Sequence, residues 1–234
     1  MCGRLRLEND YSETKIAWNP ADTRPLNYPP RFNGAPTQDF PILRYETAGK
    51  ARTFTMMRWG LIPGWAKDDK IGYSTFNARS EELAGKPTFR AAWKAGRRCI
   101  VPVTGFYEWK KLDAKGKDKQ PYLVTLKDGK VMGLAGLWEE RKRDGGEVQR
   151  TFTIVTTKAN KFMSALHDRM PVILDQKTAT AWLNEEQTEP DAAADLMKPC
   201  PDKWLAMVPV DKRMGNVKNW QEEFCRPIEG QLDG

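Results

Sequence analysis

The sequence predicts an α+β fold: one β-rich domain of mostly antiparallel strands with a few packed helices. Segments rich in β-branched and aromatic residues outnumber helical segments along the 234 residues. The two kinds of segment do not alternate regularly, which argues against a doubly wound parallel sheet. No internal repeat or long linker divides the chain, so we expect one domain over residues 1–229 and a short tail over 230–234.

Six short segments have strand character: Thr53–Trp59, Cys99–Val103, Tyr122–Leu126, Val131–Leu137, Thr151–Thr156 and Trp204–Val208. Lys127–Lys130 contains an Asp-Gly pair and predicts a hairpin turn between two of them. Residues rich in Gly, Lys and Asp predict loops over Leu112–Lys119 and Arg143–Glu147. Helices are expected over Pro87–Ala95, Asn160–Leu166, Asp175–Asn184 (with Asp175 as N-cap) and Pro190–Met197.

The composition indicates a packed globular protein, since 40% of residues are apolar and 10% aromatic. No segment approaches the roughly 18 apolar residues of a membrane helix. Charges interrupt the N-terminus, so no signal peptide is expected, and we expect the protein in the cytosol or nucleoid. Neither a P-loop nor a GxGxxG motif occurs, which gives no support to a nucleotide cofactor.

The net charge of +7 and pI near 9.2 point weakly to a polyanionic partner. Much of the excess charge lies in Lys110–Lys119 and Arg141–Arg143. Segments of consecutive charged residues usually lie on a solvent-exposed surface, so the simpler interpretation of both runs is that they are exposed hairpin loops.

No metal site is expected from the cysteines and histidine. The four cysteines, Cys2, Cys99, Cys200 and Cys225, form no CxxC pair, which disfavours a zinc ribbon, and a disulfide framework is not expected in the cytosol. Cys99 lies in an apolar run and is expected to be a small buried side chain. His167 is the only histidine, so a multi-histidine metal centre is also disfavoured.

Cys2 is the first candidate for chemistry. Loss of Met1 would leave Cys2 with a free α-amine and a thiol, whose reference pKa values are about 7.7–8.0 and 8.5. An aldehyde can form a Schiff base with this amine, and the thiol can then close a thiazolidine ring. Arg4 would favour the thiolate and suit a phosphate. The alternative is that Cys2 is an ordinary residue at a frayed terminus.

Three further residues are candidates. His167, between a helical segment and a Pro-terminated turn, could shuttle protons near pH 7. Glu108 lies among aromatic residues after an apolar strand, where partial desolvation raises a carboxyl pKa; the alternative is an edge-strand residue facing solvent. Asn77 offers an amide donor and acceptor, and Arg79 could bind a phosphate. Taken alone, Phe76–Glu81 would be a loop leading into a helix.

The chain is rich in tryptophan, with nine in 234 residues. The segment Trp59–Trp65 is broken by Gly and Pro, and aromatic residues on such loops are typical of single-stranded nucleic acid binding. Core packing is the plainer interpretation for most of the tryptophans, including Trp59 and Trp138.

Taken together, these motifs resemble the SRAP (SOS response-associated peptidase) family. The matching segments are Met1–Arg4, Phe32–Pro36, Trp59–Pro63, Asn77–Glu81, Gly105–Trp109, Leu166–Pro171 and Gly215–Asn219, in the order seen in that family. They extend from residue 2 to about residue 219. As a set they are highly specific, whereas a single motif would not be.

The resemblance implies a β-rich fold that binds abasic sites in single-stranded DNA or at single-strand/double-strand junctions. It implies that Cys2 forms the thiazolidine without a cofactor and that Asn77 orients the lesion. By the same resemblance, Glu108 transfers protons at the Cys2 amine and the sugar, and His167 assists opening of the sugar and the reverse reaction. It also matches Arg4, Arg79 and Arg169 to phosphate contacts and Pro36, Trp65 and Thr156 to the DNA path. A monomer is expected, with unknown replication partners.

Two departures from the family pattern stand out. Phe32 replaces the usual tyrosine, so a role for a hydroxyl there is absent, and Pro87 stands where a basic DNA contact is expected, with Lys86 beside it.

Two other functions remain as alternatives. One is a cysteine peptidase that uses Cys2, Glu108 and His167 to release its own N-terminus. The other is a non-catalytic single-strand binding module, whose binding would be reversed by salt.

Overall fold

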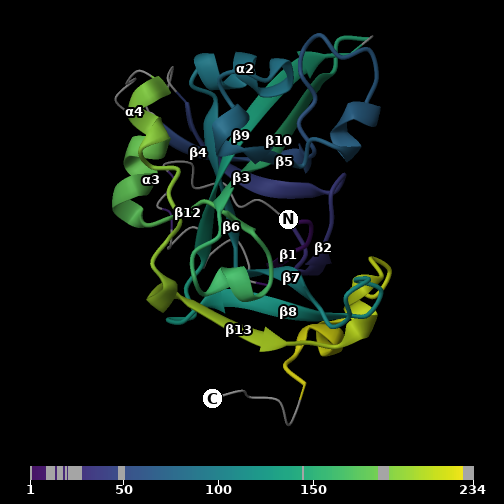
Figure 1. The fold of residues 1–234 in the computed structure, drawn as a ribbon. Coiled ribbons are helices and arrows are strands. Elements are labelled where there is room, and N and C mark those ends of the chain that lie inside the picture. The colour runs from purple at the N-terminus through teal and green to yellow at the C-terminus, as the bar shows by residue number, and fades with distance from the viewer. Residues whose placement is uncertain are drawn as a thin grey trace.

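The computed structural model describes residues 2–8, 14, 18, 20, 28–46, 51–143, 145–183 and 190–228. Figure 1 shows two groups of strands, one above the other, with the N-terminal end of the chain between them. The helices lie around the upper group: α2 (Pro87–Lys94), α3 (Gln176–Trp182) and α4 (Pro190–Ala194). No helix within the described ranges is long and apolar enough to cross a membrane.

The lower group is a five-stranded antiparallel sheet. Its order is β13 (Leu205–Pro209), β8 (Lys119–Leu126), β7 (Gly105–Lys111), β1 (Leu5–Leu7) and β2 (Arg31–Gly34). The short strand β1 therefore has a partner on each side, β7 and β2. Pairing on both sides holds the N-terminal segment inside the molecule instead of leaving it at an edge.

The upper group contains the remaining strands. Its order is β11 (Arg169–Pro171), β10 (Val148–Lys158), β4 (Ala51–Trp59), β3 (Asp39–Glu46), β6 (Arg98–Val103), β9 (Met132–Lys142) and β12 (Ile173–Leu174), with β5 (Asn77–Arg79) also paired to β10. Because β9 pairs with β10 as well, β10, β4, β3, β6 and β9 close into a five-stranded barrel. Among the described strands, only the pairings of β10 with β4 and β5 are parallel, so the predicted β-rich, mostly antiparallel α+β fold is confirmed.

Two apolar clusters use opposite faces of the barrel strands. Successive side chains on a strand point to opposite faces, so adjacent residues belong to different clusters. The pairs are Ile42 and Leu43, Val101 and Ile100, and Ile154 and Val155, with the first residue of each pair in one cluster and the second in the other. The first of each pair joins Leu5, Phe106 and Val124 of the lower sheet. The second joins residues of α2 and α3. The barrel wall is therefore covered by the lower sheet in one direction and by helices in the other.

The helices are fixed to the barrel by buried tryptophans. Trp182 of α3 donates its indole N–H to the carbonyl of Cys99 at 2.9 Å and packs against Trp93 of α2. Asp175 accepts a hydrogen bond from the backbone N–H of Thr178 at 2.7 Å, which confirms it as the N-cap of α3. Cys99 is fully buried, as expected.

All six predicted strand segments are strands, with shifted ends, and α2 matches its predicted range closely. The predicted loops Leu112–Lys119 and Arg143–Glu147 join antiparallel pairs, β7 to β8 and β9 to β10, except that Lys119 already begins β8; residue 144 lies outside the described residues. Short helical turns complete the fold: η1 (Lys70–Tyr73), η2 (Ser80–Glu82), η3 (Met163–Ala165), η4 (Asp202–Trp204), η5 (Lys212–Gly215) and η6 (Glu222–Cys225).

Four local predictions are wrong. Lys127–Lys130 is a turn but not a hairpin, because β8 belongs to the lower sheet and β9 to the barrel. Asn160–Leu166 forms only the short turn η3, and α4 ends at Ala194, before Met197. Phe76–Glu81 contains strand β5, because β10 offers a free edge for it to pair with. Asn184 and the predicted tail at 230–234 lie outside the described residues.

Gly136 is required where β9 closes the barrel. A Cβ atom there would lie 2.8 Å from the carbonyl oxygen of Thr153 and 2.9 Å from the sulfur of Cys99. Gly136→Ala should therefore lower the free energy of unfolding by about 1–3 kcal/mol through overpacking. Urea unfolding measures this, with Gly85→Ala as the control because a Cβ at Gly85 meets no atom within 4 Å. Equal stability of the two variants would contradict the close approach at Gly136.

Candidate active site

Cys2 is buried between the two groups of strands, with 1% of its surface exposed. The backbone N–H of Tyr107 donates to the carbonyl of Arg4 at 3.0 Å, which extends the pairing of β1 with β7 toward Cys2. Burial raises the pKa of the Cys2 thiol, and the charge of Glu108 raises it further. Burial and the charge of Glu108 outweigh the opposing effects of the N-terminal amine and of a hydrogen bond from the backbone of Arg4, so these surroundings disfavour the thiolate that Arg4 was expected to favour. The alternative of a frayed terminus is wrong, because Cys2 is buried.

Asn77 connects the barrel to Cys2. Its side-chain Nδ2 donates to the carbonyl oxygen of Cys2 at 2.7 Å. Its position is set by β5, whose parallel pairing places Asn77 opposite Ile154 of β10. The other end of the amide, Oδ1, is buried and has no hydrogen-bond partner among the described residues. An acceptor without a partner is costly when buried, so this oxygen is suited to a donor brought by a ligand.

Glu108 approaches Cys2 from the lower sheet. It lies on β7, between β1 and β8, and only 3% of its surface is exposed. The alternative of an edge-strand residue facing solvent is therefore wrong. Its carboxylate is close enough to Cys2 to disfavour a second negative charge on the thiol. The chemistry of these two groups is thus coupled.

His167 lies two residues before β11 and is partly exposed. Its Nδ1 accepts a hydrogen bond from the backbone N–H of Arg169 at 3.0 Å and lies 2.7 Å from Oδ1 of Asp168. A neutral ring that accepts at Nδ1 carries its proton on Nε2, whereas a protonated ring can donate Nδ1–H to Asp168. Both protonation states therefore have a partner, which suits a residue that exchanges protons.

The structure brings Cys2, Asn77 and Glu108 together, and it places the His167 segment next to their apolar surroundings. Met163 and Met170, on either side of His167 in the sequence, belong to the same buried cluster as Cys2. Within the described ranges, no group of three or more His, Cys, Asp or Glu side chains could hold a metal ion.

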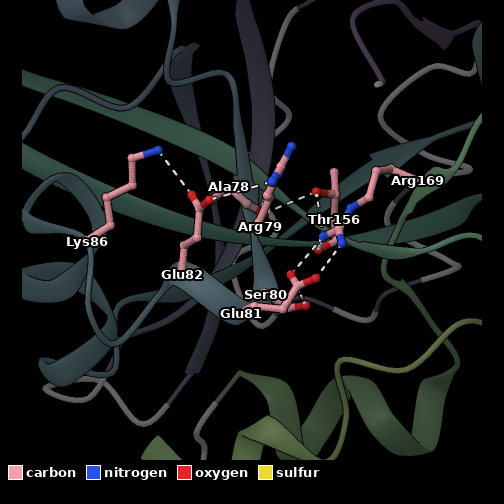
Figure 2. A network of polar contacts seen from close by, with 8 residues as sticks. All are labelled: Ala78, Arg79, Ser80, Glu81, Glu82, Lys86, Thr156 and Arg169. Atoms are coloured by element: carbon pink, nitrogen blue, oxygen red, sulfur yellow. Dashed lines mark hydrogen bonds and ion pairs between the residues drawn. The ribbon is translucent and has the colours of Figure 1, made fainter.

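Arg169 links the segments that carry Asn77 and His167. Figure 2 shows its guanidinium facing Glu81, with which it makes two hydrogen bonds, and the carbonyl oxygen of Thr156, to which it donates at 2.7 Å. Arg169 and Thr156 are both buried. Glu81 follows Asn77 on η2, so this ion pair ties the β5 segment to β11. Glu81 was not singled out from the sequence as a site residue, although it ends the motif that begins at Asn77.

Arg79 lies on the exposed side of the same network. Its guanidinium is 3.9 Å from Glu82, whose carboxylate also pairs with Lys86, as Figure 2 shows. Such an exposed pair contributes little stability. Arg79 is therefore the arginine of this network whose charge is most open to a ligand.

Arg4 is occupied by the protein itself. It donates to Oδ1 of Asn33 at 2.9 Å and to the carbonyls of Met214 and Gly215. Asn33 in turn bonds the carbonyls of Met214, Asn216 and Asn219. The motifs at 32–36 and 215–219 thus meet and fix the N-terminal segment. Pro36 lies half-buried in the turn after β2, and Trp65 lies exposed on the loop after β4.

The chain is similar to known proteins over most of its length. Residues 1–217 match the family model for SOS response associated peptidase (SRAP). The chain is 40% identical over 225 residues to the abasic site processing protein YoqW of Bacillus subtilis, covering 96% of this chain and 98% of that protein. It is 31% identical over 233 residues to the abasic site processing protein HMCES of Gallus gallus, covering 86% of this chain and 67% of that protein.

Two solved structures share the fold. A protein from Bacteroides thetaiotaomicron superposes with a TM-score of 0.85 at 24% identity, covering 97% of this chain and 100% of that chain. A protein from Bordetella bronchiseptica superposes with a TM-score of 0.76 at 25% identity, covering 90% and 100%.

The Glu81–Arg169 pair should make stability depend on pH. The hydrogen bond from Arg169 lowers the pKa of Glu81 from 4.5 to about 2. Its contribution is therefore present above the unfolded-state pKa and is lost as the pH falls from about 5 toward 2. Glu81→Gln should lower the free energy of unfolding by about 1 kcal/mol at pH 7, allowing for solvent screening, and by less at pH 4.

Urea unfolding at pH 7, 5 and 4 measures this difference. Glu82→Gln is the matched control, because Glu82 is the neighbouring carboxylate and makes only exposed pairs. A loss for Glu81→Gln that is equal at every pH would contradict the ion pair as its cause.

Proposed function

This chain belongs to the SRAP family and handles abasic sites in DNA, and we propose that it captures them in single-stranded DNA as a covalent adduct of Cys2. The proposal requires removal of Met1, because only then does Cys2 have a free amine. It further includes recognition of lesions at single-strand/double-strand junctions and shielding of the lesion during replication. We take the protein to act in the cytoplasm or nucleoid as a monomer, through one SRAP domain over residues 1–229.

The proposed reaction has two bond-forming steps. The Cys2 amine attacks C1′ of the ring-opened sugar, and water leaves to give an imine. The Cys2 sulfur then adds to the imine carbon while the thiol proton passes to the nitrogen, which closes the thiazolidine. No oxidant, reductant or cofactor is needed, because the substrate supplies the aldehyde and Cys2 supplies both nucleophiles.

The observation that carries the proposal is the position of Cys2, buried between the two groups of strands with Asn77 on its carbonyl and Glu108 near its thiol. Burial and the nearby charge of Glu108 raise the pKa of the thiol and so disfavour its thiolate form. This supports attack by the amine first, followed by ring closure at high effective concentration. It disfavours the peptidase alternative, in which a thiolate must attack a peptide carbonyl first.

Three residues are proposed to assist. Glu108 accepts a proton from the Cys2 amine and exchanges protons with the sugar. His167, whose two protonation states each have a partner, assists ring opening and the reverse reaction. Asn77 holds the Cys2 carbonyl through Nδ2, and its buried Oδ1 can accept a hydrogen bond from a hydroxyl of the opened sugar, which orients the lesion.

The residues predicted to line the DNA path differ in exposure and in their hydrogen bonds within the protein. Arg79 and Trp65 are exposed and suit direct contact with the strand. Arg4 and Arg169 already make several hydrogen bonds within the protein. We therefore propose that they attract phosphates through their charge and not through direct hydrogen bonds. Pro36 and Thr156 remain predicted positions along the path.

Incubation with an abasic-site oligonucleotide followed by a denaturing gel tests the proposal. The wild-type protein should give an adduct that survives denaturant, and Cys2→Ala should give none while retaining much of its non-covalent DNA binding. Intact mass should show the active chain without Met1. An equally stable adduct of the alanine variant, or full activity of a chain that retains Met1, would rule out the thiazolidine.

The proton-transfer residues should control rate and not the product. His167→Ala and Glu108→Gln should each slow adduct formation, its reversal or both by about 10² to 10⁴, the usual contribution of general acid–base groups. Single-turnover kinetics measures the forward rate, and a competitor trap measures the reverse rate. Peptide mapping should still locate the DNA on Cys2. Wild-type rates in both directions for both variants would remove these roles.

A further inference from the structure

The loop between β4 and β5 displays two large aromatic side chains to solvent. Trp65 is 61% exposed and Tyr73 is 65% exposed. Tyr73 is the last residue of η1 and comes shortly before Asn77, which bonds Cys2. Exposed aromatic residues grouped on one loop lose apolar burial, so they call for a binding partner.

The base of this loop is closed by its own hydrogen bonds. The backbone N–H of Leu61 donates to the carbonyl of Thr75 at 3.3 Å, and the hydroxyl of Thr75 donates to the carbonyl of Leu61 at 2.6 Å. Gly60 and Gly72 touch through their backbones, since a Cβ on Gly60 would lie 2.3 Å from the oxygen of Gly72. The two ends of the loop are therefore held together.

A second set of contacts clamps the outer part of the loop to the β9–β10 hairpin. Arg141 of β9 donates to the carbonyl of Ala66, beside Trp65, at 2.8 Å and pairs with Asp69. Arg143 pairs with the same carboxylate, and Gln149 of β10 donates to it at 3.2 Å. Arg141 is mostly buried, so the run Arg141–Arg143 is not simply the solvated loop that the sequence suggested.

The charge around Asp69, on the same loop as the two aromatic residues, is positive. The Asp69 carboxylate is surrounded by the guanidinium groups of Arg58, Arg141 and Arg143, so three positive charges face one negative charge. Lys67 and Lys70 add two more basic side chains to the loop and Asp68 adds one acidic side chain, so the net charge of these groups stays positive. Exposed aromatic side chains together with basic side chains are the combination that binds single-stranded nucleic acid, because bases stack on the rings and the basic groups attract phosphates.

We propose that Tyr73 is a second base-stacking residue beside Trp65, and that the Asp69–Arg141 pair holds both rings outward as one fixed surface for single-stranded DNA next to the lesion. This inference rests on the proposed function and adds to it a specific surface. Since the loop runs directly into β5, the stacked bases are those that flank the abasic nucleotide held at Cys2 and Asn77. Preorganisation by the clamp lowers the entropy lost on binding.

The test of Tyr73 uses an oligonucleotide with a tetrahydrofuran residue at the lesion, which has no aldehyde and cannot form the adduct. Tyr73→Ala should raise the Kd by about fivefold to a hundredfold, and Tyr73→Phe should restore wild-type affinity because the ring remains. The salt dependence of Kd should not change, since no charge is removed. Trp220→Ala is the control, because Trp220 is 66% exposed but lies far along the chain on another loop.

Removal of the stacked base should abolish the effect of Tyr73→Ala. A second tetrahydrofuran residue is placed in turn on the 5′ and the 3′ side of the first. On one side, the wild type should lose affinity and the variant should lose none. Wild-type affinity of Tyr73→Ala for every oligonucleotide, or equal loss in Tyr73→Ala and Tyr73→Phe, would overturn the stacking role.

The clamp is tested by the direction in which one substitution changes the Kd for DNA. Asp69→Ala removes a negative charge near the DNA, so electrostatics alone predicts tighter binding, whereas loss of the clamp predicts weaker binding. We expect a Kd raised at least threefold with an unchanged salt slope. Tighter binding would overturn the clamp. A denaturing gel with a true abasic site separates the two proposals, because Tyr73→Ala and Asp69→Ala should still form the adduct on Cys2 at saturating DNA.

Discussion

The insertion of the N-terminal segment between two groups of strands is the constraint on which the site depends. A chain terminus is ordinarily frayed, and a reactive group at a frayed end has no defined surroundings. Here β1 pairs with β7 and β2, and the amide of Asn77 reaches from the barrel to the carbonyl of Cys2. Cys2 therefore meets Glu108 from one sheet and Asn77 from the other. Neither sheet alone forms this site.

Several charged residues serve to join segments. Arg4 binds Asn33 and the loop at 214–215, and Arg169 joins Glu81 to Thr156. Arg141 and Asp69 join the loop of Trp65 to the β9–β10 hairpin. Buried guanidinium groups need acceptors, and each of these finds them on a segment distant in sequence. The chain as a whole carries a net charge of +7, which agrees with DNA as the partner.

The strands that sequence patterns revealed are those with long apolar runs, such as β6, β9 and β10. The short strands β1, β5 and β11 carry or adjoin Cys2, Asn77 and His167, and each has only three residues. Three residues are too few for a period of two to be visible, so only the pairing partner decides that they are strands. The turn at Lys127–Lys130 shows the converse case, because its Asp-Gly pair specifies a turn but not which sheets it joins.

The sequence by itself determined the β-rich α+β class, the family, and the residues capable of the chemistry, because these follow from residue types and their order. It pointed to Cys2, Asn77, Glu108 and His167 individually. Only the tertiary structure decided that Cys2 is buried in surroundings that raise the pKa of its thiol, and that Arg4 and Arg169 are bound within the protein. Burial and hydrogen-bond partners are set by contacts between segments far apart in the chain, and such contacts leave no local pattern in a single sequence.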